Sequence, residues 1–409
     1  MGVVCFARKK HLNVMNALGW QWAFWISVSL ALYPYAIYAA LLWIGCRLLK
    51  RDAIAPTKES SIWEESVPAV SVIVAAYNEE RLVGRKIEQV LETIRGKAAN
   101  ELIVVSDHST DRTLDVAGAI ANSQLRVFSN EGDRGRAGAH NFAVSHAMNE
   151  VLVFTDVETR VPRETLIRMA AAFRQREVGC ANAEISFSRD ENDEVAEASG
   201  SYWRFEMWLR AMETKLNLYA TSSGPCMALR RALYRELPVT GDVDFTSPLD
   251  VVDQGSLCVH LSGALAFDVM PANDRAEFRV RVRMVAKNFS GTLQRWGLVN
   301  LVKRPGYSWA IYSHKILRWL TPFFMLGALI SNIALAGRAW WYGGFLFLQF
   351  AFYLAALVGW YAYRRKTRWP IVGQMYAFVL ANVAFAAGIL KVLMGTVPTF
   401  YVPTRQFDV

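Results

Sequence analysis

From Ala69 to Glu80 the chain reads AVSVIVAAYNEE. Its first part, up to Ala76, is apolar and rich in β-branched residues, which is typical of a strand buried inside a parallel sheet. Similar segments follow, separated by segments with helical spacing. The expected strands are Ala69–Ala76, Glu101–Val105, Leu125–Phe128 and Val151–Thr155, and the expected helices are Glu79–Ile94, Asp111–Ala121 and Gly138–Ala147. Because strand and helix alternate, the sequence predicts an α/β domain with a mostly parallel sheet.

Polar residues follow these strands at the points where the strands end. Tyr77, Asn78 and Glu79 come after the first strand, Asp107 after the second and Asp156 after the fourth. Ligands of open parallel sheets bind outside the carboxyl ends of the strands, so these side chains are expected on one rim. A single Asp in such a place is more often a helix cap. Their joint occurrence favours a binding site.

Asp156 and Glu158, two residues apart at a strand end, are candidates for a divalent cation site. Hard cations take carboxylate and phosphate oxygens together, so an ion here could hold a diphosphate. Arg134 and Arg136 stand among glycines at the start of an expected helix. Arginines and helix N-termini both suit phosphate.

Several other site motifs are missing from the sequence. There is no GxxxxGK[ST], which excludes a P-loop, and no GxGxxG after the first strand, which disfavours a dinucleotide fold. The six histidines form no HExxH, so zinc chemistry is not expected. The five cysteines are scattered and never form CxxC, so we expect unpaired, buried thiols.

Apolar residues make up 53% of the 409 residues, and the net charge is +9. This composition excludes a disordered chain, and no internal repeat is visible. The apolar residues concentrate in segments long enough to span a bilayer as helices. These segments are Trp20–Leu49, Leu317–Ala336, Trp340–Tyr363 and Ile371–Met394. The first is too long for a signal peptide and has no cleavage site, so a retained membrane helix is expected.

The short basic loop Arg364–Arg368 predicts the orientation of the chain, because such loops stay in the cytoplasm. The large middle segment is then cytoplasmic too, which agrees with Arg47, Lys50 and Arg51 just after the first helix, although Arg8–Lys10 oppose it. Both chain ends are expected outside. We therefore expect an integral protein of the inner or plasma membrane, and the positive charge fits an anionic cytoplasmic leaflet.

The pattern divides the chain into four parts. Residues 1–55 hold the first membrane helix, 56–280 the α/β domain, 281–316 interfacial helices and 317–409 the remaining membrane helices. The interfacial part is expected because basic residues and Trp gather there, as they do at the water–lipid boundary. A break is expected at Pro305-Gly306.

Taken together, the motifs resemble the family 2 glycosyltransferases, and within them the membrane-embedded, cellulose-synthase-like branch. The resemblance covers roughly Pro68 to Leu298. It is carried by SVIVAAYNEE, VVSDHSTDRT, GRAGAHN and FTDVET, and further on by TSSGPCMALRR (Thr221–Arg231) and GDVDFTSPLDVVDQG (Gly241–Gly255). It implies a Rossmann-like GT-A fold for the α/β domain.

The resemblance also implies roles for donor-binding residues. Tyr77, Asn78, Glu79 and Asp107 would hold the nucleobase and ribose of a nucleotide-sugar, with a UDP-sugar expected. Arg136 and Asn141 belong to the motif that lies near the donor. Asp156 and Glu158 occupy the two acidic places of a DxD-type motif and would bind Mg2+ or Mn2+ on the diphosphate.

Asp244 is the general base that the resemblance implies, because its spacing to Gly255 matches the acidic segment of the family. Val243 stands where the family usually has the first acid of a pair, which leaves three alternative bases. These alternatives are Asp242, Asp250 and Asp253.

The sequence departs from the Q-x-x-R-W motif of the processive members. Glu277–Asn288 reads EFRVRVRMVAKN, with Arg283 and Met284 in place of Arg-Trp, and the QRW at Gln294 has a different spacing. Arg283, together with Arg281, is expected to neutralise the departing diphosphate. The Trp platform for an acceptor sugar is absent at that place.

The sequence therefore predicts an inverting, metal-dependent glycosyltransferase of the hexosyltransferase type. It would move a sugar from a nucleotide-sugar to a hydroxyl of a lipid-linked or polysaccharide acceptor at the cytoplasmic membrane face. The expected partners are the donor, the acceptor and membrane lipids, with no nucleic acid. A processive polysaccharide synthase and an inactive scaffold subunit of an assembly complex are the alternatives.

Overall fold

The structure is a computed structural model. It describes residues 2–49, 63–188, 194–219, 221–222, 224–269, 273–295, 297, 302, 304–367 and 369–397, with side chains except at 2–16, 188 and 194–202.

The centre of the molecule is one sheet of seven described strands in the order β3-β2-β1-β4-β6-β5-β7. The strands are β1 Val70–Ala76, β2 Glu101–Ser106, β3 Leu125–Ser129, β4 Val151–Thr155, β5 Val178–Ser188, β6 Cys226–Arg230 and β7 Leu257–Val269. Strands β1 to β4 are parallel, β6 is antiparallel to both of its neighbours, and β5 and β7 are parallel. The predicted mostly parallel α/β fold is confirmed.

Strand β1 shows why the sheet is buried on both sides. Val72 and Val74 pack into one core, whereas Ile73, which points the other way, packs into a second core. Helices α3 (Val83–Ile94), α4 (Thr113–Gly118) and α6 (Arg163–Ala172) contribute to the first core, and α5 (Arg136–His146) contributes to the second. An apolar run without alternation is what this two-sided burial requires.

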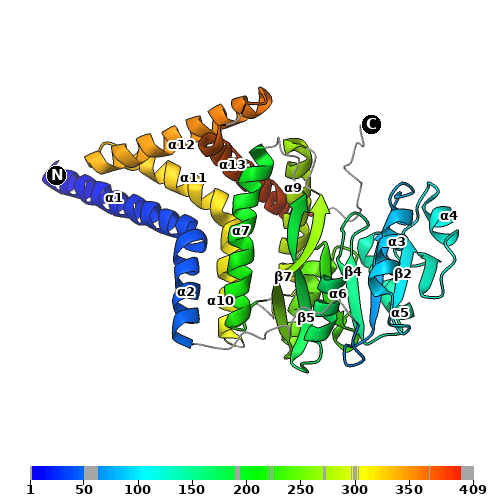
Figure 1. The fold of residues 1–409 in the computed structure, drawn as a ribbon. Helices are drawn as coiled ribbons and strands as arrows, with labels where there is room; N and C mark the ends of the chain where they lie inside the picture. Colours follow the sequence, from blue (N-terminus) through cyan, green and yellow to red (C-terminus); the bar gives the residue numbers. More distant parts are fainter. Residues whose placement is uncertain are drawn as a thin grey trace.

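The second half of the domain adds two helices, of which the second carries Asp244. Helix α7 (Glu194–Lys215) follows β5, and helix α8 (Val243–Asp253) precedes β7. Helix α9 (Asp274–Gln294) then leaves the sheet and lies between the domain and the apolar helices (Figure 1). The expected boundary at residue 280 falls inside α9, which continues without a break.

Four helical segments among the described residues are long and apolar enough to cross a membrane, one near the N-terminus and three near the C-terminus. They are Ala17–Leu49, Pro305–Leu335, Trp340–Arg364 and Pro370–Leu393. The four predicted segments are thus present. The second begins at Pro305, which lies at the first helical position, so the expected break at this residue is the start of a helix.

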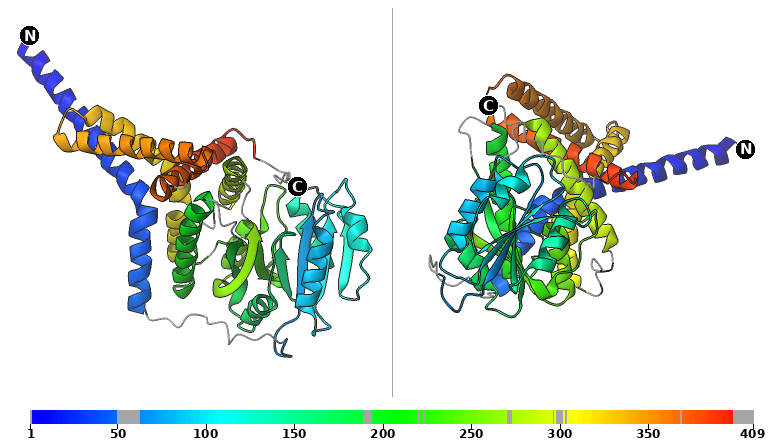
Figure 2. Two further views of the ribbon diagram at one scale, coloured as in Figure 1. Left: turned by 45° about the horizontal axis from the view of Figure 1, so that its top comes forward. Right: turned by 90° about the vertical axis from the view of Figure 1, so that its right-hand side faces the viewer.

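Two of these segments bend at short π-helical turns (Figures 1 and 2). The turn Tyr33–Ile37 separates α1 (Gly2–Leu32) from α2 (Tyr38–Leu49), and Tyr312–Ile316 separates α10 (Pro305–Ile311) from α11 (Leu317–Leu335). Pro34 accounts for the first turn, because proline cannot donate the helical hydrogen bond. The two turns touch: the Tyr33 hydroxyl lies 3.1 Å from Ser313 Oγ.

The last two apolar helices, α12 (Trp340–Arg364) and α13 (Pro370–Leu393), differ in how they contact the rest of the chain. Most of α12 is exposed, whereas α13 packs against α9 and contributes Phe385 and Ile389 to a core shared with α8. Of the cysteines with described side chains, Cys46, Cys180, Cys226 and Cys258 are free. The side chain of Cys5 lies outside the described residues.

Candidate active site

The candidate site lies where the strand order reverses. From β1 the chain builds outward through β2 to β3, and it then returns to place β4 on the other side of β1. Both neighbours of β1 are parallel to it, so the carboxyl ends of the three strands meet at one edge. Such a switch point opens a crevice for a ligand. Tyr77 and Asp156 follow β1 and β4 directly and stand on either side of it.

Asp107, at the end of β2, holds the loop that leads into α5. Its buried carboxylate accepts hydrogen bonds from Asn130 Nδ2 at 2.8 Å and from the Gly135 amide at 2.9 Å. Gly135 has a φ of 111°, a conformation that favours glycine. The described contacts of Asp107 are therefore to the protein's own loop, which they fix in place.

That loop brings an arginine over the tyrosine at the end of β1. The Arg134 guanidinium lies 5.5 Å from the centre of the Tyr77 ring, and its Nη2 donates to the Tyr77 hydroxyl at 3.1 Å. The pair is a flat, partly exposed platform with a positive charge on one side. Such a surface suits a planar, anionic ligand such as a nucleotide.

Asn78 and Glu79 join the first two loops of the rim. Asn78 has a positive φ of 54°, and its side-chain oxygen accepts from the Thr110 amide at 2.8 Å. The Glu79 amide donates to Thr113 Oγ1 at 2.8 Å, and the Glu79 carbonyl accepts from the first turn of α3. This turn explains why α3 begins at Val83, later than the sequence predicts.

Arg136, the first residue of α5, forms an ion pair with Asp156 at the end of β4. The guanidinium also reaches the Gly224 carbonyl at 3.4 Å. The Asp156 side chain keeps 27% of its surface exposed, so this carboxylate is open to a ligand. Glu158 follows on the same turn and is half-buried. The structure thus places three of the predicted residues together.

Asp244, in the first turn of α8, lies against the same group. A Cβ added to Gly224 would be 2.8 Å from Asp244 Oδ2, so the glycine permits a close approach of the backbone to this carboxylate. Asp244 Oδ1 is buried and has no hydrogen-bond partner among the described residues. Burial and the neighbouring charge of Asp242 raise the pKa of Asp244 to about 6, although Arg136 acts against the rise.

Asp242 is the partner that makes Asp244 a strong base candidate. Burial alone would raise the pKa of Asp242, but Lys287, Arg136 and Arg283 together hold it below its usual value. Lys287 Nζ lies 3.4 Å from Asp242 Oδ2. Two neighbouring carboxyl groups are therefore pushed apart in pKa, which is how a protein obtains one ionised anchor and one proton acceptor.

The site contains two residues that the sequence interpretation missed. Lys287 lies four residues after Arg283 on α9, and His140 lies four residues after Arg136 on α5. Burial lowers the pKa of His140 to about 3, so its ring is neutral beside Asp242. The spacing of four residues, which places side chains on one face of a helix, could have found both residues.

Other predicted residues lie apart from this group. Asn141 bonds the Leu237 backbone at both its amide and its carbonyl and accepts from the Tyr234 hydroxyl. Asp250 is buried in a pair with Arg295 at 2.9 Å, and Asp253 pairs with Arg235 at the same distance. Arg281 forms an ion pair with Glu277 on its own helix at 2.6 Å.

A buried lysine supports the strand end from behind. Lys86 Nζ donates to Thr155 Oγ1 at 3.1 Å and to the Thr159 carbonyl. Burial lowers the pKa of Lys86 to about 8, whereas burial and the charge of Asp156 raise the pKa of nearby Asp268 to about 6. Thr159 Oγ1 donates to Asp268 Oδ1 at 3.1 Å, so the turn that carries Asp156 and Glu158 is fixed from both sides.

The carboxylate oxygens at the strand end can coordinate a divalent cation only if a bound molecule supplies further oxygen atoms. Among the described residues, no three His, Cys, Asp or Glu side chains converge as a complete metal site. Asp156 and Glu158 offer hard oxygen atoms, and the remaining positions of a Mg2+ or Mn2+ ion are then left to phosphate oxygens. This is the arrangement expected for an ion that binds with a diphosphate.

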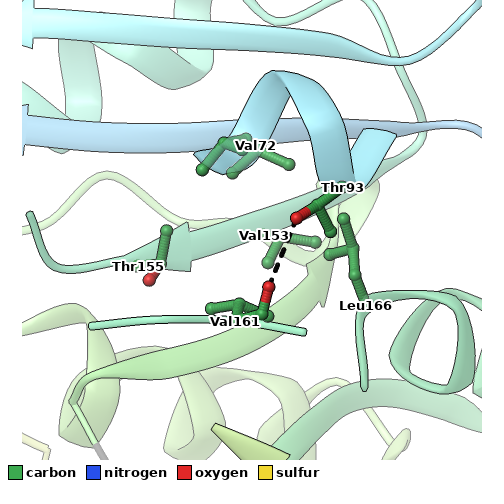
Figure 3. A pocket seen from close by; sticks show the side chains of 7 residues that line it. Val72, Thr93, Val153, Thr155, Val161 and Leu166 are labelled. Atoms are coloured by element: carbon green, nitrogen blue, oxygen red, sulfur yellow. Dashed lines mark hydrogen bonds between the residues drawn. The ribbon is translucent and has the colours of Figure 1, made fainter. Parts of the chain in front are cut away.

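A small cavity behind β4 is a packing gap in the core (Figure 3). Its lining is nearly all apolar, from β1, β4, α3 and α6, and the Thr93 hydroxyl donates to the Val161 carbonyl at 3.3 Å. Dry apolar gaps of this kind hold no polar ligand. The candidate site is the crevice at the strand ends, on the far side of Thr155.

Comparison with known proteins defines the class. Residues 71–238 match the family model described as "Glycosyl transferase family 2". The mannosyltransferase PcManGT from Pyrobaculum calidifontis, solved with GDP-Man and Mn2+, superposes with a TM-score of 0.68 over 91% of this chain and 99% of that chain, at 19% identity. Residues 71–238 therefore form a domain of the family 2 glycosyltransferase type, with a GT-A fold, as the motifs predict.

Two curated relatives match parts of the chain. A beta-monoglucosyldiacylglycerol synthase of Nostoc sp. is 22% identical over 191 residues, which are 44% of this chain and 41% of the relative. The Escherichia coli enzyme WfgD, named a UDP-Glc:alpha-D-GlcNAc-diphosphoundecaprenol beta-1,3-glucosyltransferase, is 33% identical over 87 residues, 21% of this chain and 34% of that enzyme. The match thus spans less than half the length of either relative.

Proposed function

We propose that this protein is an inverting, metal-dependent transferase that moves a sugar from a nucleotide-sugar, of the UDP-sugar class, to a hydroxyl of a lipid-linked or glycan acceptor. The observation that carries the proposal is the position of Asp244. Its buried carboxylate, with a pKa of about 6, stands beside the Arg136–Asp156 pair at the switch point of the sheet. A proton acceptor next to a diphosphate site is what transfer to a hydroxyl requires.

The relatives support this class of donor and acceptor. The name of WfgD states a UDP-sugar donor and a diphosphoundecaprenol-linked acceptor, and the name of the Nostoc relative states a diacylglycerol product. Both products are membrane lipids, and this chain has four candidate membrane spans. A lipid-borne acceptor is therefore the proposal that fits the relatives and the apolar helices together.

Binding of the donor would use the rim residues. The Tyr77–Arg134 platform, with Asn78, Glu79 and the loop held by Asp107, would receive the nucleoside. Asp156 and Glu158 would hold Mg2+ or Mn2+ together with the diphosphate, and the ion would stabilise the negative charge of the leaving nucleotide. Arg136 and Arg283 would add positive charge around the same diphosphate.

The transfer step would use Asp244. Its carboxylate accepts the proton of the acceptor hydroxyl while the hydroxyl oxygen attacks the anomeric carbon, and the bond to the nucleotide diphosphate breaks. Lys287 keeps Asp242 ionised, so the proton goes to Asp244. One direct displacement inverts the anomeric centre, and this mechanism needs one base and no covalent intermediate.

The first experiment is nucleotide release by the full chain in detergent. A panel of UDP-, GDP- and dTDP-sugars is offered with Mn2+ or Mg2+, with and without a native lipid extract. We expect release from one donor that rises strongly when lipid is added and stops when a chelator removes the ion. A large polymer formed without lipid would favour a processive synthase, and absence of both release and nucleotide binding would favour a scaffold.

The variant Asp244→Asn tests the base directly. Transfer should fall by about 10²–10⁴-fold, the usual contribution of general base catalysis, while nucleotide binding is retained. The matched control is Asp115→Asn, which removes an exposed carboxylate of α4 and should leave transfer unchanged. Turnover like that of the wild type in Asp244→Asn would overturn the assignment.

A further inference from the structure

Helix α9 carries four cations at a spacing of four residues. They are Arg275, Arg279, Arg283 and Lys287. Residues four apart are neighbours on a helix surface and form one ridge along it. Arg281 is not on this ridge, and it is paired with Glu277.

The ridge runs from the surface of the molecule into the candidate active site. Arg275 and Arg279 are exposed and have no ion-pair partner among the described residues. Arg283 is half-buried, and Lys287 is buried against Asp242, next to the proposed base Asp244. The ridge therefore has two exposed cations at one end, and at the other end Arg283 and Lys287 act on Asp242 in the candidate site.

The outer end of the ridge lies at the apolar helices. The Asp274 amide donates to the Tyr363 hydroxyl at 3.1 Å, and the Tyr376 hydroxyl donates to Asp274 Oδ2 at 2.9 Å. Tyr363 lies in the last turn of α12, directly before Arg364, the first residue of the basic segment Arg364–Arg368. Gly388 of α13 lies so close to α9 that an added Cβ would be 2.9 Å from the Val282 carbonyl oxygen. Helix α9 therefore packs directly against α13 (Figure 2).

We propose that Arg275 and Arg279 bind a phosphate group of a lipid acceptor, so that the acceptor extends along the ridge and its hydroxyl reaches Asp244. This inference rests on the proposed transferase function and narrows the acceptor to a phosphate-bearing lipid. Arginine is suited to the role because its guanidinium binds phosphate with two parallel hydrogen bonds. The Arg364 end of α12 places this entrance where lipid head groups lie.

The length of the ridge agrees with such an acceptor. Arg279 and Lys287 are eight residues apart on α9, which corresponds to about 12 Å along a helix. A diphosphate and one sugar span a comparable length. A lipid whose phosphate is held at Arg279 can therefore present a sugar hydroxyl at Asp244 while its chain stays beside α13. A neutral diacylglycerol offers no charge for the outer arginines.

The test measures acceptor binding without the donor. The full chain is placed in nanodiscs of phosphatidylcholine that carry either a long-chain polyprenyl phosphate or the corresponding neutral polyprenol. The double variant Arg275→Gln/Arg279→Gln should bind the phosphate about tenfold more weakly, because two exposed charge pairs are lost. The matched control Arg85→Gln/Arg176→Gln removes two exposed arginines of the sheet domain and should bind as the wild type does.

Three results would overturn the inference: equal binding of polyprenyl phosphate and polyprenol, equal weakening in both double variants, or wild-type binding in the Arg275/Arg279 variant. Loss of affinity for all phosphatidylglycerol vesicles, without a change for the dilute polyprenyl phosphate, would assign the arginines to general bilayer attachment instead. If the variant does not fold, the binding of polyprenyl phosphate to the wild type is measured at rising salt concentration instead. Binding of the phosphate by exposed arginines must weaken as salt rises, and binding that does not weaken would overturn the inference. Release of the nucleotide from the donor is measured separately, so a failure of the proposed transferase function can be distinguished from a failure of this inference.

Discussion

In the proposed transfer reaction Asp244 is the general base, and its pKa depends on the neighbouring charge of Asp242. A general base works only when it is deprotonated, so a pKa raised to about 6 predicts that kcat/KM falls below about pH 6 and reaches a plateau above it. Asp242→Asn removes a negative charge that raises this pKa. The acidic limb of the profile should then move to lower pH.

The measurement is kcat/KM against pH for the wild type, Asp242→Asn and the control Asp115→Asn. Only the Asp242 variant should shift the limb, and it should shift in the acidic direction. A limb that stays in place in this variant would show that the titrating group is not coupled to Asp242. A shift to higher pH would show that the negative charge of Asp242 is not what raises the pKa of the titrating group.

Gly224 is a second residue whose identity the site requires. An added Cβ would lie 2.8 Å from Asp244 Oδ2, closer than real Cβ contacts come, so Gly224→Ala should displace the base. We expect kcat to fall by about tenfold or more with little change in the KM for the donor, because misplacement of a catalytic group acts on the transition state. Gly118→Ala, where an added Cβ meets nothing within 4 Å, is the control.

At this scale the sequence predicts which residues lie together at the strand ends in some cases and not in others. Arg136, Asp156 and Asp244 stand together in the structure, because each follows a strand or opens a helix at the same edge of the sheet. Lys287 and His140 come from the interiors of helices, where the only local signal is their spacing of four residues from Arg283 and Arg136. That spacing places them on the same helix face as the two arginines, but which side chains they meet there depends on how the helices pack.

At the scale of elements, a buried ionic cluster joins the sheet domain to the apolar helices. Glu206 of α7 accepts from Arg210, Lys315 and Arg318 and lies 2.9 Å from His314 Nε2. Burial would raise the pKa of Glu206, but its contacts with His314, Lys315 and Arg210 hold it well below the usual value. The cluster surrounds the π-helical turn Tyr312–Ile316, so it fixes the bend of that segment.

Glu206→Ala should therefore destabilise the protein strongly. The change leaves several buried cations without their anion, and breaking a buried ion pair in this way costs about 3–5 kcal/mol. The measurement is the apparent Tm of the full chain in detergent. Glu92→Ala is the control, because its pair with Arg95 is about 70% exposed on both sides and should contribute less than about 1 kcal/mol. Equal small shifts in both variants would contradict a structural role for the cluster.

The sequence predicts the elements better than their ends and bends. The first four strands lie within one residue of their expected bounds, because a β-branched apolar run between polar turns allows little choice. Helix α3 starts late, since Asn78 and Glu79 use their backbone groups to join the loops. Pro34 marks one bend in the sequence, but the second bend contains no proline and depends on the Glu206 cluster.

At the scale of the whole molecule, the sequence predicts how the chain is oriented in the membrane. The structure adds one fact to this prediction: the Asp274 amide bonds Tyr363, so the turn after α12 lies beside the sheet domain. The basic turn and the proposed donor site therefore lie on the same side of the membrane. Short basic loops stay in the cytoplasm, and charged nucleotide-sugars do not cross a bilayer unaided, so both features agree with a cytoplasmic location. The loop at Gly337, at the other end of α12, is then outside.

Reporter fusions test this orientation. Alkaline phosphatase, which is active only outside the cytoplasm, should be active when fused after Gly337 and inactive when fused after Lys366. Replacing Arg364, Arg365 and Lys366 by Gln should weaken the difference, because it removes the charges that retain this turn in the cytoplasm. Activity after Lys366 in the unmodified chain would place the sheet domain outside, since the Tyr363–Asp274 bond keeps the two together. The nucleotide-sugar proposal would then fail with the orientation, because both depend on the same side of the membrane.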